Sequence, residues 1–229
     1  MVVVSKIGRV GTGASRQTVA WAARELSMAD DENYRVYNPN QGNAVYSCSP
    51  QEVMYDQRAE LTYLRYRWVY DRRRKLRTDR GELVVAIDGA CRGNGTPNAT
   101  AAYGVYFGHG SCYNRCGLLP WNERHTSQNA EIYAAQIAFD FITENFSCKG
   151  ITIITDSSYL VKAMTEYIYK WVRNGFISSG TNRRIVNAGA LENLHETIVD
   201  MEVEGVDVRF WHVRREDNED ADALANAAF

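Results

Sequence analysis

The strongest constraint on the fold is an apolar run that ends abruptly in a carboxylate and a glycine-rich turn. Residues 83–95 read L-V-V-A-I-D-G-A-C-R-G-N-G, so Asp88 directly follows five apolar residues. An unbroken run of this kind is typical of a strand buried on both faces, and α/β sheets usually place their chemistry at the ends of such strands. Asp88 is therefore a candidate functional residue, although Asp followed by Gly is also common turn chemistry.

A second strand-like run ends in the same way. Residues 151–156 read I-T-I-I-T-D, which places Asp156 directly after the apolar stretch. Two core strands that each deliver an acid favour carboxylates gathered to hold a cation. The second run thus favours a functional role for Asp88 over a turn role.

The chain from residue 82 onward has a regular pattern of secondary structure. Strand-like residues 101–107 and 111–119 flank a G-H-G turn, which predicts an antiparallel hairpin. Apolar residues at steps of three and four predict helices over residues 127–146, 157–173 and 190–203. A last strand at 206–213 and a short helix through residue 224 complete the order β-β-β-α-β-α-β-α.

Two further carboxylates lie near the starts of predicted helices. Glu131 is in the first turns of the helix at 127–146, and Asp222 is in the last helix. Either residue alone is explained well enough as a surface or capping acid. Together with Asp88 and Asp156 they form a set that would repel strongly without cations. Such a set suits two hard divalent cations about 4 Å apart, which can bind the attacking oxygen and the leaving oxygen when a phosphodiester is hydrolysed.

Four motifs carry a resemblance to a known family: D-G-A-C-R-G-N-G from Asp88, T-S-Q-N-A-E at 126–131, T-D-S-S-Y at 155–159 and N-E-D-A-D-A-L-A at 218–225. Over about residues 83–228 the chain resembles the type 1 ribonuclease H family. The resemblance implies an α/β fold whose mixed five-stranded sheet, three antiparallel strands followed by parallel additions, is flanked by helices. It also implies two-metal hydrolysis of the RNA strand of RNA–DNA hybrids, giving 5′-phosphate and 3′-hydroxyl ends. The cofactor implied is Mg²⁺, two ions per site, with Mn²⁺ as an alternative, and the implied catalytic and metal-binding residues are Asp88, Glu131, Asp156 and Asp222.

The resemblance also implies a set of substrate contacts. The matching positions are Asn94 and Gln128 for the RNA strand, Arg124, Thr126 and Asn187 for a DNA-strand phosphate, and Tyr167, Trp171 and Ser179 for the channel that seats the DNA strand. Asn187 matches only after a one-residue shift in its loop. Ordinary turn and capping polarity would also explain Asn94 and Gln128, and core packing would also explain Tyr167.

The segment after the last predicted strand departs from the family. Many members have a longer loop there that carries a histidine, whereas residues 212–218 read only H-V-R-R-E-D-N. Counting back from Asn218 makes His212 that histidine. Matching H-V to the strand's end instead makes His212 a strand residue and leaves Arg214 or Arg215 in the loop. We favour the second alignment, so no histidine is included among the catalytic residues.

The charge distribution divides the chain into two parts. Residues 1–80 carry 14 Lys and Arg against 9 Asp and Glu, whereas residues 81–229 carry 12 against 19. We therefore predict an N-terminal extension over 1–80, partly irregular, and a catalytic domain over 81–229. Within the extension, residues 57–80 predict a basic helix because Leu61, Leu64 and Trp68 are near helical spacing. This helix would either form a nucleic-acid-binding or nuclear-import patch or serve as a solvated linker docked through Trp68.

Composition argues against a membrane protein, a secreted protein and a standard zinc module. No apolar stretch approaches the length of a membrane span, and the first ten residues lack a secretory signal's apolar block. Five scattered cysteines fit reduced thiols, and the spacing of His109, Cys112, Cys116 and His125 matches no standard zinc module. We expect an intracellular monomer in the nucleus or cytoplasm, with the mitochondrion as an alternative, whose partner is an RNA–DNA hybrid and not a membrane. The alternative function is a non-catalytic hybrid-binding domain or a different nuclease of the same fold.

Overall fold

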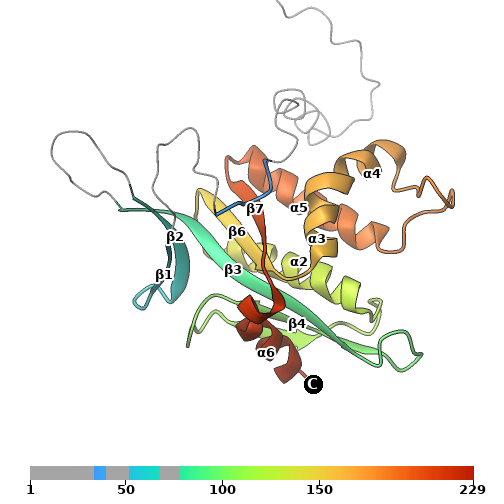
Figure 1. Ribbon diagram of the computed structural model, residues 1–229, viewed down its shortest axis with the longest axis horizontal. Coiled ribbons are helices and arrows are strands. Elements are labelled where there is room, and N and C mark those ends of the chain that lie inside the picture. The colour runs from blue at the N-terminus through green and yellow to red at the C-terminus, as the bar shows by residue number, and fades with distance from the viewer. Residues whose placement is uncertain (1–33, 40–51, 68–77) are drawn as a thin grey trace, which may run out of the picture. The chain divides into compact units, whose positions relative to one another are not determined.

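The computed structural model describes residues 34–39, 52–67 and 78–229, and the described strands form one seven-stranded mixed sheet (Figure 1). The strands are β1 (Glu52–Asp56), β2 (Leu61–Arg67), β3 (Thr78–Arg92), β4 (Thr100–Tyr106), β5 (Arg115–Leu118), β6 (Gly150–Thr155) and β7 (Asp207–His212). The long strand β3 organises the sheet. Its first half pairs antiparallel with β2 and its second half with β4, while β6 pairs parallel with it and β7 pairs parallel with β6.

The predicted five-stranded sheet is confirmed as β3 to β7. Strands β3, β4 and β5 are antiparallel, and β6 and β7 are the parallel additions. The hairpin β1–β2 adds two antiparallel strands to this core, and the sequence patterns did not predict them.

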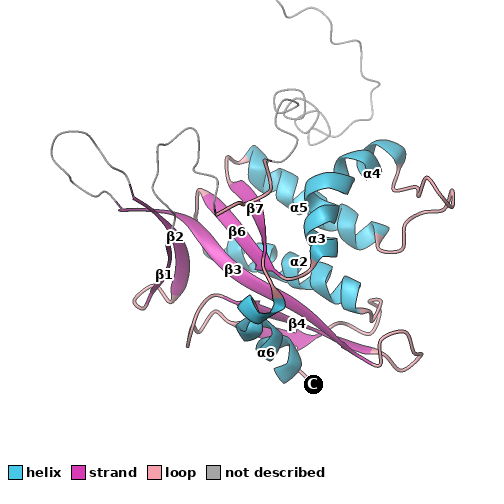
Figure 2. Cartoon of the chain, viewed as in Figure 1, coloured by secondary structure: helices cyan, strands magenta, loops and turns pink. Residues whose placement is uncertain are grey.

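The helices lie on both faces of the sheet (Figure 2). They are α2 (Ser127–Asn145), α3 (Ser158–Lys162), the π-helical turn η1 (Ala163–Tyr167), α4 (Ile168–Asn174), α5 (Ala188–Val203), the 3₁₀ turn η2 (Arg215–Asp217) and α6 (Glu219–Ala227). The three helical stretches predicted from periodicity are therefore present, with one π-helical turn inside the second. Within the described ranges, no helix has the length and apolar character needed to cross a bilayer.

Two glycines fix α2 and α6 against opposite faces of the sheet. A Cβ on Gly89 of β3 would collide with the backbone nitrogen of Glu131, which belongs to α2. A Cβ on Gly104 of β4 would collide with the carbonyl oxygen of Ala221, which belongs to α6. Gly104 pairs with Asp88, the neighbour of Gly89 in β3, and successive residues of a strand point to opposite faces. Asp88 therefore shares the α6 face, and both helices pack directly on main chain.

The main core lies between the sheet and the helices α2 to α5. It contains fully buried side chains from β3, β6, α2 and β7, among them Val85, Ile153, Phe139 and Phe210. This packing holds the strand ends, and with them the acids that follow the strands, in fixed positions.

The predicted basic helix over 57–80 is wrong for the residues that the structure describes. Residues 61–67 form β2, and residues 78–80 begin β3. Leu61 and Leu64 are three apart, which resembles a helical stripe, yet Leu61 joins the main core and Leu64 joins a second cluster with Val84 and Tyr37. The three-residue spacing of Leu61 and Leu64 therefore arises because the two side chains pack in different clusters, and it does not indicate a helix. Trp68 and Arg72 to Lys75 lie outside the described residues.

The predicted hairpin around residues 108–110 forms with a longer loop than expected. Strand β4 ends at Tyr106 and β5 begins at Arg115. The Asn114 side chain accepts a hydrogen bond from the Phe107 backbone N–H (2.7 Å) and donates one to the Gly108 carbonyl (2.9 Å). These two bonds replace strand pairing between residues 107 and 114.

A short segment near the N-terminus is joined to the sheet by a backbone bridge and to α5 by a buried ion pair. Val36 forms a parallel bridge with Phe210 of β7. The preceding residue, Arg35, is buried, and its Nε and Nη2 donate to the two carboxylate oxygens of Glu202 at 2.8 and 2.7 Å. Burial, and then the Arg35 charge, lower the pKa of His195 to about 3, so its neutral ring accepts from Arg35 Nη1 at 3.3 Å. Residues far apart in sequence thus form one buried polar network.

Candidate active site

Three of the four predicted acids converge at one end of the sheet. Asp88 comes from β3, Asp156 follows β6, and Glu131 is in the second turn of α2. One carboxylate oxygen from each lies within 4.8 Å of the others. Because β3 and β6 are parallel, Asp88 and Asp156 lie at the same end of the sheet. The close approach at Gly89 places the start of α2 at that end too.

Burial and the nearby charges raise the pKa values of two of the three acids. Burial raises the pKa of Asp88 to about 7, and the charges of Asp156 and Asp222 add to the effect. Burial also raises the pKa of Glu131 well above its ordinary value, with Asp88 and Asp156 contributing. Asp88 and Glu131 therefore resist ionisation at neutral pH. An oxygen-only site under such repulsion suits a hard divalent cation, so Asp88, Glu131 and Asp156 fit the metal site that the sequence predicts.

We expect the raised pKa of Asp88 to appear in the stability of the metal-free protein. The ordinary pKa of Asp88 is 3.8, so between this value and about 7 the folded protein keeps a proton that the unfolded chain loses, and stability falls as pH rises. His195 acts in the opposite direction, so the informative quantity is the difference between wild type and Asp88→Asn. In EDTA, urea unfolding should show that the stability of Asp88→Asn relative to wild type increases by about 2 kcal/mol between pH 5 and pH 7. An equal relative stability at both pH values would contradict the raised pKa.

Hydrogen bonds from neighbouring residues position the acids. Asn218 is buried, and its Nδ2 donates to the Ile87 carbonyl at 2.9 Å and to Asp156 Oδ1 at 3.3 Å. The Thr155 hydroxyl donates to Glu131 at 3.5 Å. The role of Asn218 was not predicted from the sequence, although this residue begins the motif N-E-D-A-D-A-L-A. The only available signal was an Asn before a helix rich in acids, which indicates a cap and not a contact with Asp156.

Asp222 lies beside the cluster rather than within it. Its carboxylate accepts hydrogen bonds from Arg215 Nη2 at 3.1 Å and from Asn226 at 3.0 Å. Its charge nevertheless contributes to the raised pKa of Asp88. Its role as a metal ligand stays a prediction.

The segment after β7 agrees with the second of the two alignments. His212 is the last residue of β7, and its ring contacts the Asp156 carbonyl oxygen through Nε2 at 3.2 Å. Arg215 lies in the short connection to α6 and is the cation that reaches Asp222. An arginine therefore lies beside the acids in the connection between β7 and α6.

The predicted substrate-binding positions around α2 are mostly accessible. Asn94, Arg124 and Gln128 are exposed. Thr126 is the N-cap of α2, where its hydroxyl accepts a hydrogen bond from the Asn129 backbone N–H. Asn187 is only 5 % exposed and its amide donates to the Tyr159 hydroxyl at 3.4 Å. The phosphate-binding role of Arg124, Thr126 and Asn187 stays a prediction, and Asn187 is the least accessible of the three.

The predicted DNA-strand channel has an exposed aromatic pair. Tyr167 is 41 % exposed, which disfavours the alternative that it is a core residue. Its ring lies 5.4 Å from that of Trp171, which packs in turn against the main core. Ser179 is exposed in the loop after α4. The arrangement leaves an aromatic surface on the helical side, and its contact with DNA stays a prediction.

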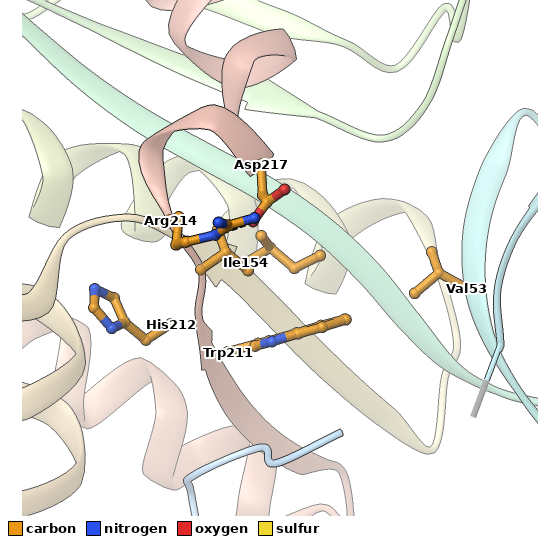
Figure 3. Close-up of a pocket in the computed structure, with 7 residues that line it drawn as sticks. Val53, Ile154, Trp211, His212, Arg214 and Asp217 are labelled. Carbon is orange, nitrogen blue, oxygen red and sulfur yellow. Dashed lines mark hydrogen bonds and ion pairs between the residues drawn. The ribbon is translucent and has the colours of Figure 1, made fainter. Parts of the chain in front are cut away.

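A pocket lies along the connection between β7 and α6. It has a volume of about 490 Å³, and Ile154, Trp211 and Val53 contribute apolar side chains to it (Figure 3). Arg214 and Asp217 point toward each other at its edge and are joined by an ion pair of 3.1 Å. None of the four predicted catalytic acids lines this pocket. We therefore place the candidate active site at the acidic cluster.

The fold and the cluster define an α/β protein with a site formed by three converging carboxylates. Residues 80–229 match the family model of RNase H, and this is more than half of the chain. The chain therefore belongs to the RNase H family, which confirms the resemblance inferred from the four motifs.

Known relatives cover the same part of the chain. Ribonuclease H1 of Mus musculus is 32% identical over an alignment of 148 residues, and the match covers 62% of this chain and 48% of that protein. Ribonuclease H of Pelobacter propionicus is 36% identical over 147 residues, which are 64% of this chain and 83% of that protein. The chain thus spans about half the length of the mouse protein. A structure of the prototype foamy virus protease–reverse transcriptase matches 69% of this chain and 22% of its own with a TM-score of 0.50 and 19% identity, a likeness of fold alone.

Proposed function

We propose that this protein is an endoribonuclease that hydrolyses the RNA strand of RNA–DNA hybrids. The observation that carries the proposal is the convergence of Asp88, Glu131 and Asp156 within 4.8 Å in a member of the RNase H family. In the reaction, the oxygen of a water attacks the phosphorus in line and the bond to the 3′ oxygen breaks. The products are a 5′-phosphate and a 3′-hydroxyl.

We propose that the three clustered acids, with Asp222 beside them, hold two divalent cations, Mg²⁺ or alternatively Mn²⁺. Bound cations would lower the pKa of a bound water and stabilise the negative charge that develops on the phosphate. The chain's own residues preorganise this site. Asn218 holds Asp156 against β3, Thr155 contacts Glu131, and Arg215 orients Asp222. The aromatic surface at Tyr167 and Trp171 would seat a nucleic-acid strand by stacking.

The test is incubation of the purified chain with labelled RNA–DNA hybrid, duplex DNA and duplex RNA. With Mg²⁺ we expect cutting of the RNA strand in the hybrid alone, and with EDTA we expect none, because the acids would then lack the cation that they are arranged to hold. Denaturing gels and end-group analysis identify the strand and the new ends. Hybrid binding without cutting would instead support a non-catalytic hybrid-binding domain.

A further inference from the structure

We propose that Trp121 is a substrate-binding residue that packs against a nucleotide of the hybrid next to the phosphate held by Arg124 and Thr126. This inference rests on the proposed function and extends its substrate-binding surface. Trp121 is 92 % exposed, the highest exposure of any large apolar side chain in the described part of the chain. The next is Val186 at 67 %. A tryptophan held almost wholly in water leaves a large apolar surface available for a ligand.

The turn that carries Trp121 is firmly anchored. The Glu123 backbone N–H donates to the Pro120 carbonyl at 2.9 Å and closes the turn around residues 121 and 122. The His125 ring braces it from beneath, because Nδ1 accepts from the Ala101 backbone N–H (2.9 Å) and Nε2 therefore carries the proton donated to the Pro120 carbonyl (3.2 Å). The exposed indole is thus displayed on a fixed base, so that ordering this turn adds little to the cost of binding.

The same loop leads into the candidate active site. The Asn129 side chain donates to the Arg124 carbonyl at 2.9 Å, which holds the backbone of that exposed arginine. Thr126 then caps α2, the helix that carries Glu131. Within six residues the loop therefore presents an aromatic ring, a cation and a hydroxyl on the approach to the acids. Glu123 is the one opposing charge in the loop, and it accepts a hydrogen bond from Asn129 at 3.3 Å.

This combination fits a nucleic-acid backbone better than other ligands. A cation neutralises a phosphate, and an aromatic ring next to it packs on a sugar or base, a contact that tolerates any sequence. The strand expected at this position is the DNA strand, since the resemblance to the ribonuclease H family matches Arg124 and Thr126 to a DNA-strand phosphate. The ring would then lie against a deoxyribose or its base on one side of that phosphate.

The test uses Asp88→Asn as background so that the hybrid stays intact during binding. Fluorescence anisotropy with a labelled hybrid should show that adding Trp121→Ala weakens binding about tenfold, whereas Trp121→Phe, which keeps a ring, should lose less than half of that effect on a logarithmic scale. Val203→Ala, an exposed apolar residue at the far end of α5, serves as the matched control and should bind normally. In the active enzyme, the loss from Trp121→Ala should appear in KM.

Shortened hybrids identify the strand. Trimming the DNA strand back past the phosphate at Arg124 should abolish the difference between wild type and Trp121→Ala, whereas trimming the RNA strand should preserve it. Unchanged affinity of Trp121→Ala for the full hybrid, in a protein whose wild type cleaves hybrids, would overturn this inference alone. A difference that depends on the RNA strand instead would overturn the strand assignment. A wild type that neither binds nor cleaves hybrids would overturn the proposed function together with this inference.

Discussion

Replacing Asp88 or Asp156 with Asn is expected to reduce hybrid cleavage by at least about 10³-fold while the protein stays folded, since bound cations contribute several kcal/mol to the reaction. Asn keeps the size of each side chain and removes the charge that would hold the cation. Asp156→Asn also keeps an oxygen that can accept from Asn218, so its position should change little. Single-turnover cleavage of a labelled hybrid at saturating enzyme measures the effect without a contribution from weak binding.

The matched control for these variants is Asp207→Asn. Asp207 is an exposed acid that begins β7, whereas Asp156 follows the end of the neighbouring parallel strand, so the two lie at opposite ends of the sheet. Asp207→Asn should cleave at the wild-type rate. Circular dichroism and thermal melts should show that all three variants are folded. Persisting activity in both Asp88→Asn and Asp156→Asn would refute the assignment of the site.

A second large effect is expected outside the acidic cluster, at Arg35. Arg35→Met leaves the Glu202 carboxylate buried without its bidentate partner, and breaking a buried ion pair in this way costs about 3–5 kcal/mol. The double variant Arg35→Met with Glu202→Met should recover most of that loss, because an apolar pair of similar volume needs no solvation. Urea unfolding of the full chain near pH 7 measures each free energy.

An exposed ion pair that involves α5, the helix that carries Glu202, provides the control. Arg184 pairs with Glu192 of α5, and both side chains are largely in water. Arg184→Met should therefore cost no more than about 1 kcal/mol. If Arg35→Met cost equally little, the buried pair would not stabilise the fold as its geometry implies. A fragment of residues 81–229 would also lose Arg35, so its behaviour could not report on the N-terminal charges alone.

Much of the candidate site could be predicted because its residues follow strong local patterns. Asp88 and Asp156 each end an apolar run, and such runs form buried strands in almost any context. Glu131 could be placed because α2 has a clear apolar stripe and a capping threonine in front of it. The sequence alone could not show that three of the acids would lie within 4.8 Å while Asp222 would pair with Arg215, because that outcome depends on how α6 packs on the sheet.

The errors and omissions arose where long-range packing decides the structure. Leu61 and Leu64 had helical spacing but are shared between two clusters around one strand, an arrangement visible only once neighbouring strands are in place. Arg35 was one cation in an irregular stretch, and its partner Glu202 is 167 residues away. Asn218 acts through contacts with Ile87 and Asp156, which no local pattern indicates.

The close packing at Gly89 and Gly104 has a consequence for how this protein could change over evolutionary time. Because the helices that carry Glu131 and Asp222 rest on main chain, any side chain at either glycine would have to push a whole helix away from the sheet. When an apolar side chain elsewhere in the core is replaced, substitutions at its neighbours can compensate for the change in volume. A contact between backbone atoms has no side chain that could be replaced in this way. The spacing of the acids is therefore insulated from drift in the surrounding core and depends on two positions where a single added methyl group is too large.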